Sequence, residues 1–171
     1  MTPGIQELIR RNEQLCDRFH EATLGEPDVA AALATTTPQI TLVNLPMRTG
    51  AADHAGLRRY LTEDVLPHRP ADLRRRRVSR TADRFRVVDE LVVGFPHDRE
   101  LPWLLPGVPP SRRAVEVLAI SVVTARQGRI ASQRTLWDLA GLLAGLDLPP
   151  DAVRPTAIPR SADQTEAAGW W

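Results

Sequence analysis

The sequence contains no lysine, and all 22 of its basic residues are arginine. Schiff-base catalysis through a lysine amine is therefore excluded. The single cysteine, Cys16, allows no intrachain disulfide and no cysteine-rich metal site. The chain also lacks any apolar run of the roughly 18 to 20 residues that a membrane span needs. Its N-terminus has no apolar core of the signal-peptide kind. We expect a cytoplasmic protein that does not contact a membrane.

An excess of charge of one sign is missing too. The 22 arginines are balanced by 21 acidic residues, so no basic field favours a nucleic-acid partner. Histidine is scarce, and the His97-Asp98 pair has no second histidine at the spacing of metal ligands. The sequence also has no glycine-rich phosphate loop. We predict no metal site, no cofactor and no nucleic-acid partner.

The chain has the composition of one globular domain. Its 171 residues are 43% hydrophobic and 25% charged, which is enough to bury a core of its own. Hydrophobic periodicity and turn residues predict helices over about 5–19, 28–33, 54–66 and 139–146. They predict strands over about 40–44, 73–81, 84–95, 114–126 and 130–137. Helices grouped ahead of an antiparallel sheet predict an α+β fold, with a strongly bent sheet wrapped around the helices as a cone.

The sequence shows no internal repeat and no linker that would divide it. We therefore predict one domain over residues 1–148. Residues 149–171 are rich in proline and alanine and are predicted to form an irregular tail, with Trp170 and Trp171 at its end.

Two stretches resemble a known family. The segment GRIASQRTLWDLAGLLAGL (128–146) is similar to the closing strand and helix of SnoaL-like polyketide cyclases, within the nuclear transport factor 2-like superfamily. The segment SRTADRFRVVDELVVGFPHDRELPWLLPGVPP (79–110) resembles a SnoaL-like subfamily with a similar VDE, then HD, then W-x-LPG-x-P pattern. The resemblance covers roughly residues 5 to 147. It implies a cone-shaped fold, a homodimer, and a cofactor-independent cyclase or isomerase acting on an apolar small molecule of the polyketide type.

Asp138 is the first catalytic candidate. In SnoaL-like cyclases the matching aspartate is the acid/base of an intramolecular aldol closure, which needs a carboxyl group whose pKa an apolar pocket raises toward neutrality. Apolar neighbours such as Leu136 and Trp137 suit that role and are candidates for substrate contact. Asp138 also immediately precedes the last predicted helix, so the competing interpretation is a helix cap.

Arg134 lies four residues before Asp138 and, by strand alternation, on the same face as Asp138 and Leu136. An arginine facing the pocket would orient a substrate carboxylate or enol oxygen, or pair with Asp138 and keep it ionised. The alternative is an arginine on an exposed strand face. Ring closure could be aldol or pericyclic, and in a pericyclic closure the pocket chiefly enforces a folded conformer.

Asp89 lies in the longest predicted strand, next to Glu90, and alternation places one of the two on the apolar side. A buried carboxylate is costly unless it is hydrogen-bonded, which marks it as structural or functional. Together, Asp89, Arg134 and Asp138 would be similar to the Asp-Arg-Asp set of limonene epoxide hydrolase, another member of the superfamily. Epoxide opening is therefore the alternative reaction.

Three further residues are candidates for the site: His20 as a catalytic residue that donates a hydrogen bond to a substrate carbonyl or shuttles a proton, and Asn44 and Trp103 as substrate-binding residues. His20 occupies a position of the first helix where many SnoaL-like proteins have tyrosine, and Asn44 ends the first strand near a substrate-binding position of some relatives. Trp103 lies in an apolar loop between prolines, which either covers the mouth of the pocket or packs at a subunit interface. A non-catalytic ligand-binding or assembly module is the third reading: if Asp138 and Arg134 point to solvent and side chains fill the cavity, the catalytic readings built on these residues fail.

Overall fold

The computed structural model describes residues 4–156 of the chain. Its helices are α1 (Ile5–His20), α2 (Val29–Ala34), α3 (His54–Arg59) and α4 (Leu139–Gly145), with helical turns at Glu21–Gly25, Tyr60–Val65 and Leu66–His68. Its strands are β1 (Thr36–Leu45), β2 (Thr49–Ala51), β3 (Arg74–Ala82), β4 (Arg86–Pro96), β5 (Ala114–Arg126) and β6 (Arg129–Trp137).

The six strands form one curved, mixed sheet in the order β2-β1-β6-β5-β4-β3. All neighbours are antiparallel except β1 and β6, which run parallel. The Gln127-Gly128 turn reverses the chain after β5, so β6 runs back beside β5. On its other side, β6 pairs with β1. Both turn residues have a positive φ, as two-residue hairpin turns of this kind require.

Three aspartates fix where helices begin. Asp28, Asp53 and Asp138 each accept a hydrogen bond from the backbone N–H three residues ahead, at 3.0, 2.7 and 3.0 Å. Such N-caps satisfy a donor that has no partner inside the helix. They set the first turns of α2, α3 and α4, and the cap at Asp138 agrees with the competing interpretation of that residue from the sequence.

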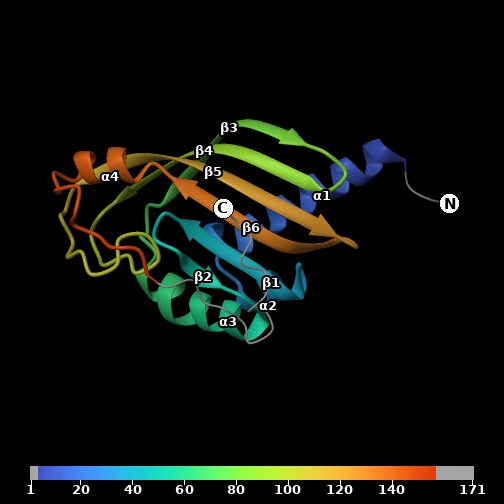
Figure 1. The fold of residues 1–171 in the computed structure, drawn as a ribbon, viewed down its shortest axis with the longest axis horizontal. Helices are drawn as coiled ribbons and strands as arrows, with labels where there is room; N and C mark the ends of the chain where they lie inside the picture. Colours follow the sequence, from blue (N-terminus) through green and yellow to red (C-terminus); the bar gives the residue numbers. More distant parts are fainter. Residues whose placement is uncertain (1–3, 157–171) are drawn as a thin grey trace.

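The helices cover one face of the sheet, and the hydrophobic core lies between the helices and that face. Figure 1 shows α1 passing behind the strands and α3 lying beside β1 and β2. Helix α1 turns a buried stripe toward the sheet, made of Asn12, Leu15, Cys16, Phe19 and His20. Along β4 every second side chain is buried, from Val87 to Phe95. The buried stripe of α1 and the buried alternate side chains of β4 therefore face the same interior.

The predicted α+β cone is confirmed, with two differences. The sheet is mixed rather than wholly antiparallel, because β1 pairs with β6 in parallel. The first two strands also differ from the prediction, because β1 begins at Thr36, ahead of the predicted start near residue 40, and the short strand β2 lies where the sequence predicts neither helix nor strand. Within residues 4–156, no helix is long and apolar enough to cross a membrane. Residues 149–156 of the predicted tail form no helix or strand, and Trp170 and Trp171 lie outside the described residues.

The opposite face of the sheet carries exposed apolar side chains. Leu118 and Ile120 on β5 are 54% and 45% exposed, and Leu136 on β6 is 52% exposed. Ile120 and Leu136 are directly paired across the two strands, so these side chains form one continuous patch. We call the three residues the outer apolar patch.

Candidate active site inside the cone

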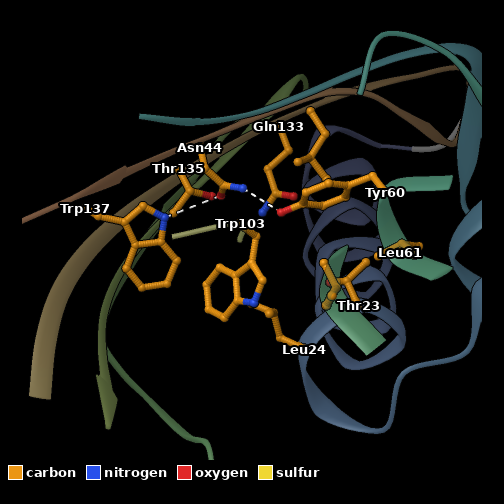
Figure 2. A pocket seen from close by; sticks show the side chains of 11 residues that line it. Thr23, Leu24, Asn44, Tyr60, Leu61, Trp103, Gln133, Thr135 and Trp137 are labelled. Carbon is orange, nitrogen blue, oxygen red and sulfur yellow. Dashed lines mark hydrogen bonds between the residues drawn. The ribbon is translucent and has the colours of Figure 1, made fainter. Parts of the chain in front are cut away.

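A small cavity lies between the helical layer and the inner face of the sheet (Figure 2). Its volume is about 30 Å³. Its lining is Thr23, Leu24, Leu42, Asn44, Tyr60, Leu61, Val65, Trp103, Gln133, Thr135 and Trp137. The cavity has room for a water-sized group, whereas sites for drug-sized ligands span roughly 300 to 1,000 Å³. Side chains therefore fill most of the cone.

Asn44 is the centre of a polar network in this cavity. Its Nδ2 donates to the Tyr60 hydroxyl at 2.7 Å and lies 3.3 Å from the Thr49 hydroxyl. Its Oδ1 accepts the Trp137 indole N–H at 3.4 Å. Figure 2 shows Asn44 between the Trp137 ring and the Tyr60 hydroxyl. Burial raises the pKa of Tyr60, so its phenol stays neutral.

Trp103 lines the cavity and belongs to the segment that follows β4. Its side chain is 2% exposed, and its ring centroid lies 5.9 Å from that of Trp137. Four apolar neighbours in the same segment, Leu101, Leu104, Leu105 and Val108, are also buried. The Thr49 hydroxyl donates to the Trp103 carbonyl at 2.5 Å and ties the segment to the polar network. Of the two positions predicted for this loop, the structure places it over the cavity.

His20 lies behind the cavity wall, at the end of α1. Its Nε2 lies 3.0 Å from Nε2 of the cavity-lining Gln133 and 3.3 Å from the Ser121 hydroxyl. The Gln133 amide nitrogen can only donate, so His20 Nε2 accepts and the ring proton is on Nδ1. Burial lowers the pKa of His20 to about 3, so the imidazole is neutral. It is separated from the cavity by Gln133.

Asp89 is the buried carboxylate of β4, while Glu90 points outward, as alternation predicted for one of the pair. Arg80 holds both oxygens of Asp89, with Nε to Oδ1 at 2.6 Å and Nη2 to Oδ2 at 2.8 Å. His20 Nδ1 lies 3.8 Å from Asp89 Oδ2, too far for a hydrogen bond, and the neutral ring makes no ion pair. Arg80 is thus the charge partner that makes the burial of Asp89 tolerable.

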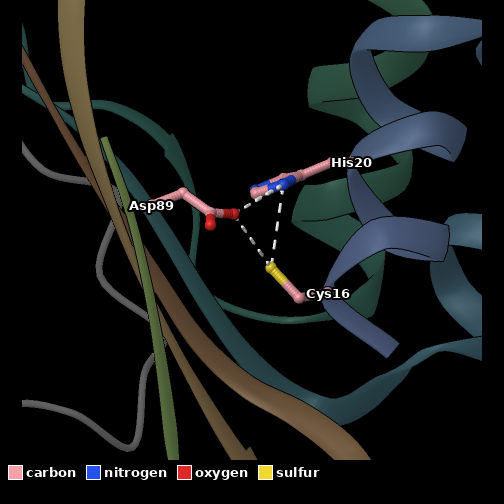
Figure 3. Close-up of side chains that lie close together, drawn as sticks. All are labelled: Cys16, His20 and Asp89. Carbon is pink, nitrogen blue, oxygen red and sulfur yellow. Dashed lines mark hydrogen bonds and ion pairs between the residues drawn. The ribbon is translucent and has the colours of Figure 1, made fainter. Parts of the chain in front are cut away.

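Cys16, His20 and Asp89 bring three metal-ligating atoms within 4.8 Å of one another (Figure 3). The spacing alone would suit a metal ion, which the sequence did not predict. Two observations favour a hydrogen-bonded cluster instead. Arg80 already occupies both Asp89 oxygens and places a positive charge beside any cation. Burial raises the pKa of Cys16 to about 12, so its side chain is a thiol rather than a thiolate ligand.

The face of β6 that meets the cavity differs from the predicted one. Gln133, Thr135 and Trp137 point inward, whereas Arg134, Leu136 and Asp138 are exposed. Arg134, Leu136 and Asp138 do share a face, but their predicted place in the pocket is wrong. The cause is a bulge: Thr124 pairs with Ser132 and Ala125 with Ile130, which leaves Ala131 unpaired and shifts the alternation by one residue.

Asp138 is the N-cap of α4, accepting from Gly141 N–H at 3.0 Å. It is exposed and does not line the cavity, so an acid/base role inside the cone has no geometric support. The Asp-Arg-Asp set expected for epoxide opening is not assembled either. Asp89 faces the interior, while Arg134 and Asp138 lie on the outer face.

Four predicted substrate contacts lie at or next to the cavity: Asn44, Trp103 and Trp137 line it, and His20 stands behind Gln133. Sequence reasoning missed Tyr60, Gln133, Ser121 and Arg80 as site residues. Tyr60, the only tyrosine of the sequence, lies within the predicted helix over 54–66, and a buried phenol needs a polar partner, which is the signal that could have found it. Gln133 has the same parity as Trp137, so the inward aromatic could have revealed it. Nothing local to the sequence marks Arg80.

Comparison with known proteins places this geometry in context. No protein-family model and no curated protein matches the sequence. Solved structures do match: a candidate SnoaL-like polyketide cyclase from Jannaschia superposes with a TM-score of 0.69 at 20% identity, over 87% of this chain and 100% of its own. The candidate polyketide cyclase IdmH from Streptomyces antibioticus gives a TM-score of 0.60 at 18% identity, over 80% of this chain and 98% of its own. AclR from Streptomyces galilaeus, a candidate hydroxylase, gives 0.62 at 18% identity, over 86% and 89%.

Proposed function

Because this chain has the nuclear transport factor 2-like fold of SnoaL-like proteins, we propose that it is a cofactor-independent cyclase or isomerase of polyketide-type small molecules in the cytoplasm. The fold alone does not select a reaction, since unrelated activities share it. The proposal therefore depends on the chemistry of the interior. Its substrate is a mostly apolar molecule that carries carbonyl or enol oxygens.

One observation carries the choice of reaction: none of the cavity-lining side chains in the described part of the chain is charged. Tyr60 is the titratable group among them, and burial keeps it neutral. His20 is neutral and lies behind Gln133. A lining of this kind offers hydrogen bonds but no ready acid or base near neutral pH. It favours pericyclic ring closure over the aldol route.

In this mechanism the cone holds a flexible substrate in the folded conformer from which the ring closes. The Trp103 and Trp137 rings pack against its apolar body, while Asn44 and Tyr60 bind an oxygen. Fixing the reacting ends within contact distance removes much of the entropic barrier. Because the cavity is small, the segment from Leu101 to Val108 moves outward when substrate enters.

The test is turnover of a linear polyketide that carries a diene and an enone, followed by chromatography and mass spectrometry. Pericyclic closure and aldol addition both give a product of unchanged mass, so NMR of the product separates them. Aldol closure turns a ketone into a new hydroxyl-bearing carbon, which can then lose water, whereas pericyclic closure consumes the diene and forms no hydroxyl. We expect kcat to stay flat between about pH 5 and 9, because no protein group changes its protonation during the reaction.

The variant Asn44→Leu removes the amide at the centre of the network, and we expect kcat/KM to fall at least about tenfold. Asp138→Asn is the matched control on the outer face and should leave turnover unchanged. A bell-shaped pH profile, or loss of turnover in Asp138→Asn with the fold intact, would reject the pericyclic mechanism. Incorporation of oxygen-18 from water would identify epoxide opening instead.

A ligand-binding module without catalysis is the second candidate, favoured by the cavity volume of about 30 Å³. Side chains fill the cone, and the predicted catalytic pair of Arg134 and Asp138 lies outside it. The two candidates separate in one experiment. A module returns the bound polyketide chemically unchanged after long incubation, whereas a cyclase returns a ring.

We also propose that the protein is a homodimer in which a second copy covers the outer apolar patch. The apolar side chains of Leu118, Ile120 and Leu136 on the outer face of the sheet would otherwise remain in water. Arg134 and Asp138 lie on the same face as Leu136, so in such a dimer they would act at the interface rather than in the pocket.

A further inference from the structure

The cavity contains a hydrogen-bond donor that has no partner among the described residues. Trp103 is almost completely buried, and its Nε1 makes no hydrogen bond there. Buried N–H groups are nearly always paired, and an unpaired one indicates a place where another molecule supplies the acceptor. Figure 2 shows the Trp103 nitrogen on the side of its ring away from Asn44.

The neighbouring indole provides an internal comparison. Trp137 lines the same cavity, but its Nε1 already donates to Asn44 Oδ1. Asn44 and Gln133, the two lining amides, are also engaged, with Tyr60 and with His20 and Ser121 respectively. The Trp103 N–H is therefore a buried donor of the described cavity wall that has no protein partner and can meet a ligand.

The chemistry of the wall restricts what that ligand carries. The lining has no charged side chain to balance an ion, and a carboxylate or ammonium would lose its hydration without a partner. An uncharged acceptor oxygen, such as a ketone, matches a single N–H donor in an apolar surrounding. The cavity of about 30 Å³ holds only a water-sized group, so an aromatic or other flat body would pack against the Trp103 and Trp137 rings once the segment from Leu101 to Val108 has moved outward.

We propose that Trp103 Nε1–H binds an uncharged acceptor oxygen of the ligand and so makes Trp103 a specificity-determining residue of the cone. This inference rests on the proposed function for its site, since it places a ligand in the same cavity. It adds the ligand class, a neutral molecule with a ketone-type oxygen, and the group that recognises this oxygen.

The test uses two probes of the same shape, acetophenone and α-methylstyrene, in which a CH2 group replaces the oxygen. The full chain is labelled with nitrogen-15, and the indole N–H signals of its four tryptophans are recorded. The variant Trp103→Phe identifies the Trp103 signal. We expect acetophenone to move that signal to lower field and to bind about fivefold more tightly than α-methylstyrene, the typical effect of one neutral hydrogen bond.

Trp103→Phe keeps an aromatic ring and removes the donor, so the preference for acetophenone should disappear. Trp137→Phe is the matched control, because the N–H that it removes already has a protein partner. It should weaken both probes by similar factors. The inference is overturned if acetophenone does not bind, if both probes bind the wild type equally, or if acetophenone binds without moving the Trp103 signal. The last readout uses the wild type and does not depend on a variant folding.

Failure of the inference can be told from failure of the proposed function. Binding of acetophenone through Trp103 without ring closure of the linear polyketide keeps the inference and rejects the cyclase. Ring closure by Trp103→Phe at an unchanged KM keeps the cyclase and rejects the inference.

Discussion

Arg80 on β3 and Asp89 on β4 face each other across two strands and share two hydrogen bonds, at 2.6 and 2.8 Å, beneath helix α1. Arg80 Nη2 also donates to Asp17 Oδ1 of α1 at 2.7 Å. The guanidinium of Arg80 therefore contacts both the helix and the sheet. The contact raises the pKa of Arg80 through its hydrogen bond to Asp89. This pair explains how a carboxylate can lie in the interior of the cone.

Removing Arg80 should therefore destabilise the protein strongly. We expect Arg80→Leu to lower the free energy of unfolding by about 3 to 5 kcal/mol, because it leaves the Asp89 carboxylate buried without a charge partner. Arg77→Leu is the matched control on the same strand, since Arg77 meets Asp17 at the surface and should cost under about 1 kcal/mol. Urea unfolding followed by circular dichroism measures both. Equal losses would contradict the account of Asp89.

His20 should make stability depend on pH. Its pKa is lowered by burial from 6.5 to about 3, so the unfolded chain binds a proton that the folded protein does not. Stability is complete above about pH 6.5 and falls as the pH drops toward 3, by up to about 1.4 kcal/mol per pH unit. Unfolding of the wild type and His20→Gln at several pH values tests this. The wild-type curve should be steeper, and identical slopes would show that His20 is not buried as a neutral ring.

Asp138 should matter for stability and not for turnover. Asp138→Ala removes the cap of α4, and we expect a loss of about 1 kcal/mol in the free energy of unfolding. Asp138→Asn keeps a capping oxygen and should lose far less. Thermal unfolding with a turnover assay on the same samples separates the roles. If the Asp138 variants kept full stability but lost turnover, Asp138 would have to act at the reacting centre.

The outer apolar patch should control assembly. We expect Leu136→Glu to convert the proposed dimer to monomers, because burying a carboxylate at the centre of an apolar interface is unfavourable. Val78→Glu is the matched control, since Val78 is similarly exposed but lies on the edge strand β3. Sedimentation velocity at several concentrations measures the state. A monomeric wild type would reject the dimer.

Much of the fold follows from local patterns. The stripe of α1, the caps Asp28 and Asp53, and the Gln127-Gly128 turn each depend on residues within a few positions of one another. The alternation of β4 likewise predicted that one of Asp89 and Glu90 points inward. Patterns of this range can be read along the chain because the forces behind them are local.

The inner face of β6 could not be predicted in the same way. Its alternation from the turn onward is broken at Ala131, and the bulge arises only when β6 pairs with β5. Because of this one extra residue, the cavity is faced by Gln133, Thr135 and Trp137. The side chains of Arg134, Leu136 and Asp138 are on the outer face instead. The position of Asp138 before a helix favoured a cap, whereas the family resemblance favoured an acid/base role, and only the packing of β6 separates the two.

The sequence by itself determined the helices, the strands other than β2, the α+β class and the inward place of one of the two carboxylates on β4. It determined them because propensity, capping and hydrophobic period act over one or two turns. Tertiary structure alone decided that Arg80 pairs with Asp89, that the buried Trp103 N–H has no partner within residues 4–156, and that Asp138 lies outside the cone. These contacts join residues far apart in the chain, and strand register and packing set them rather than any local preference.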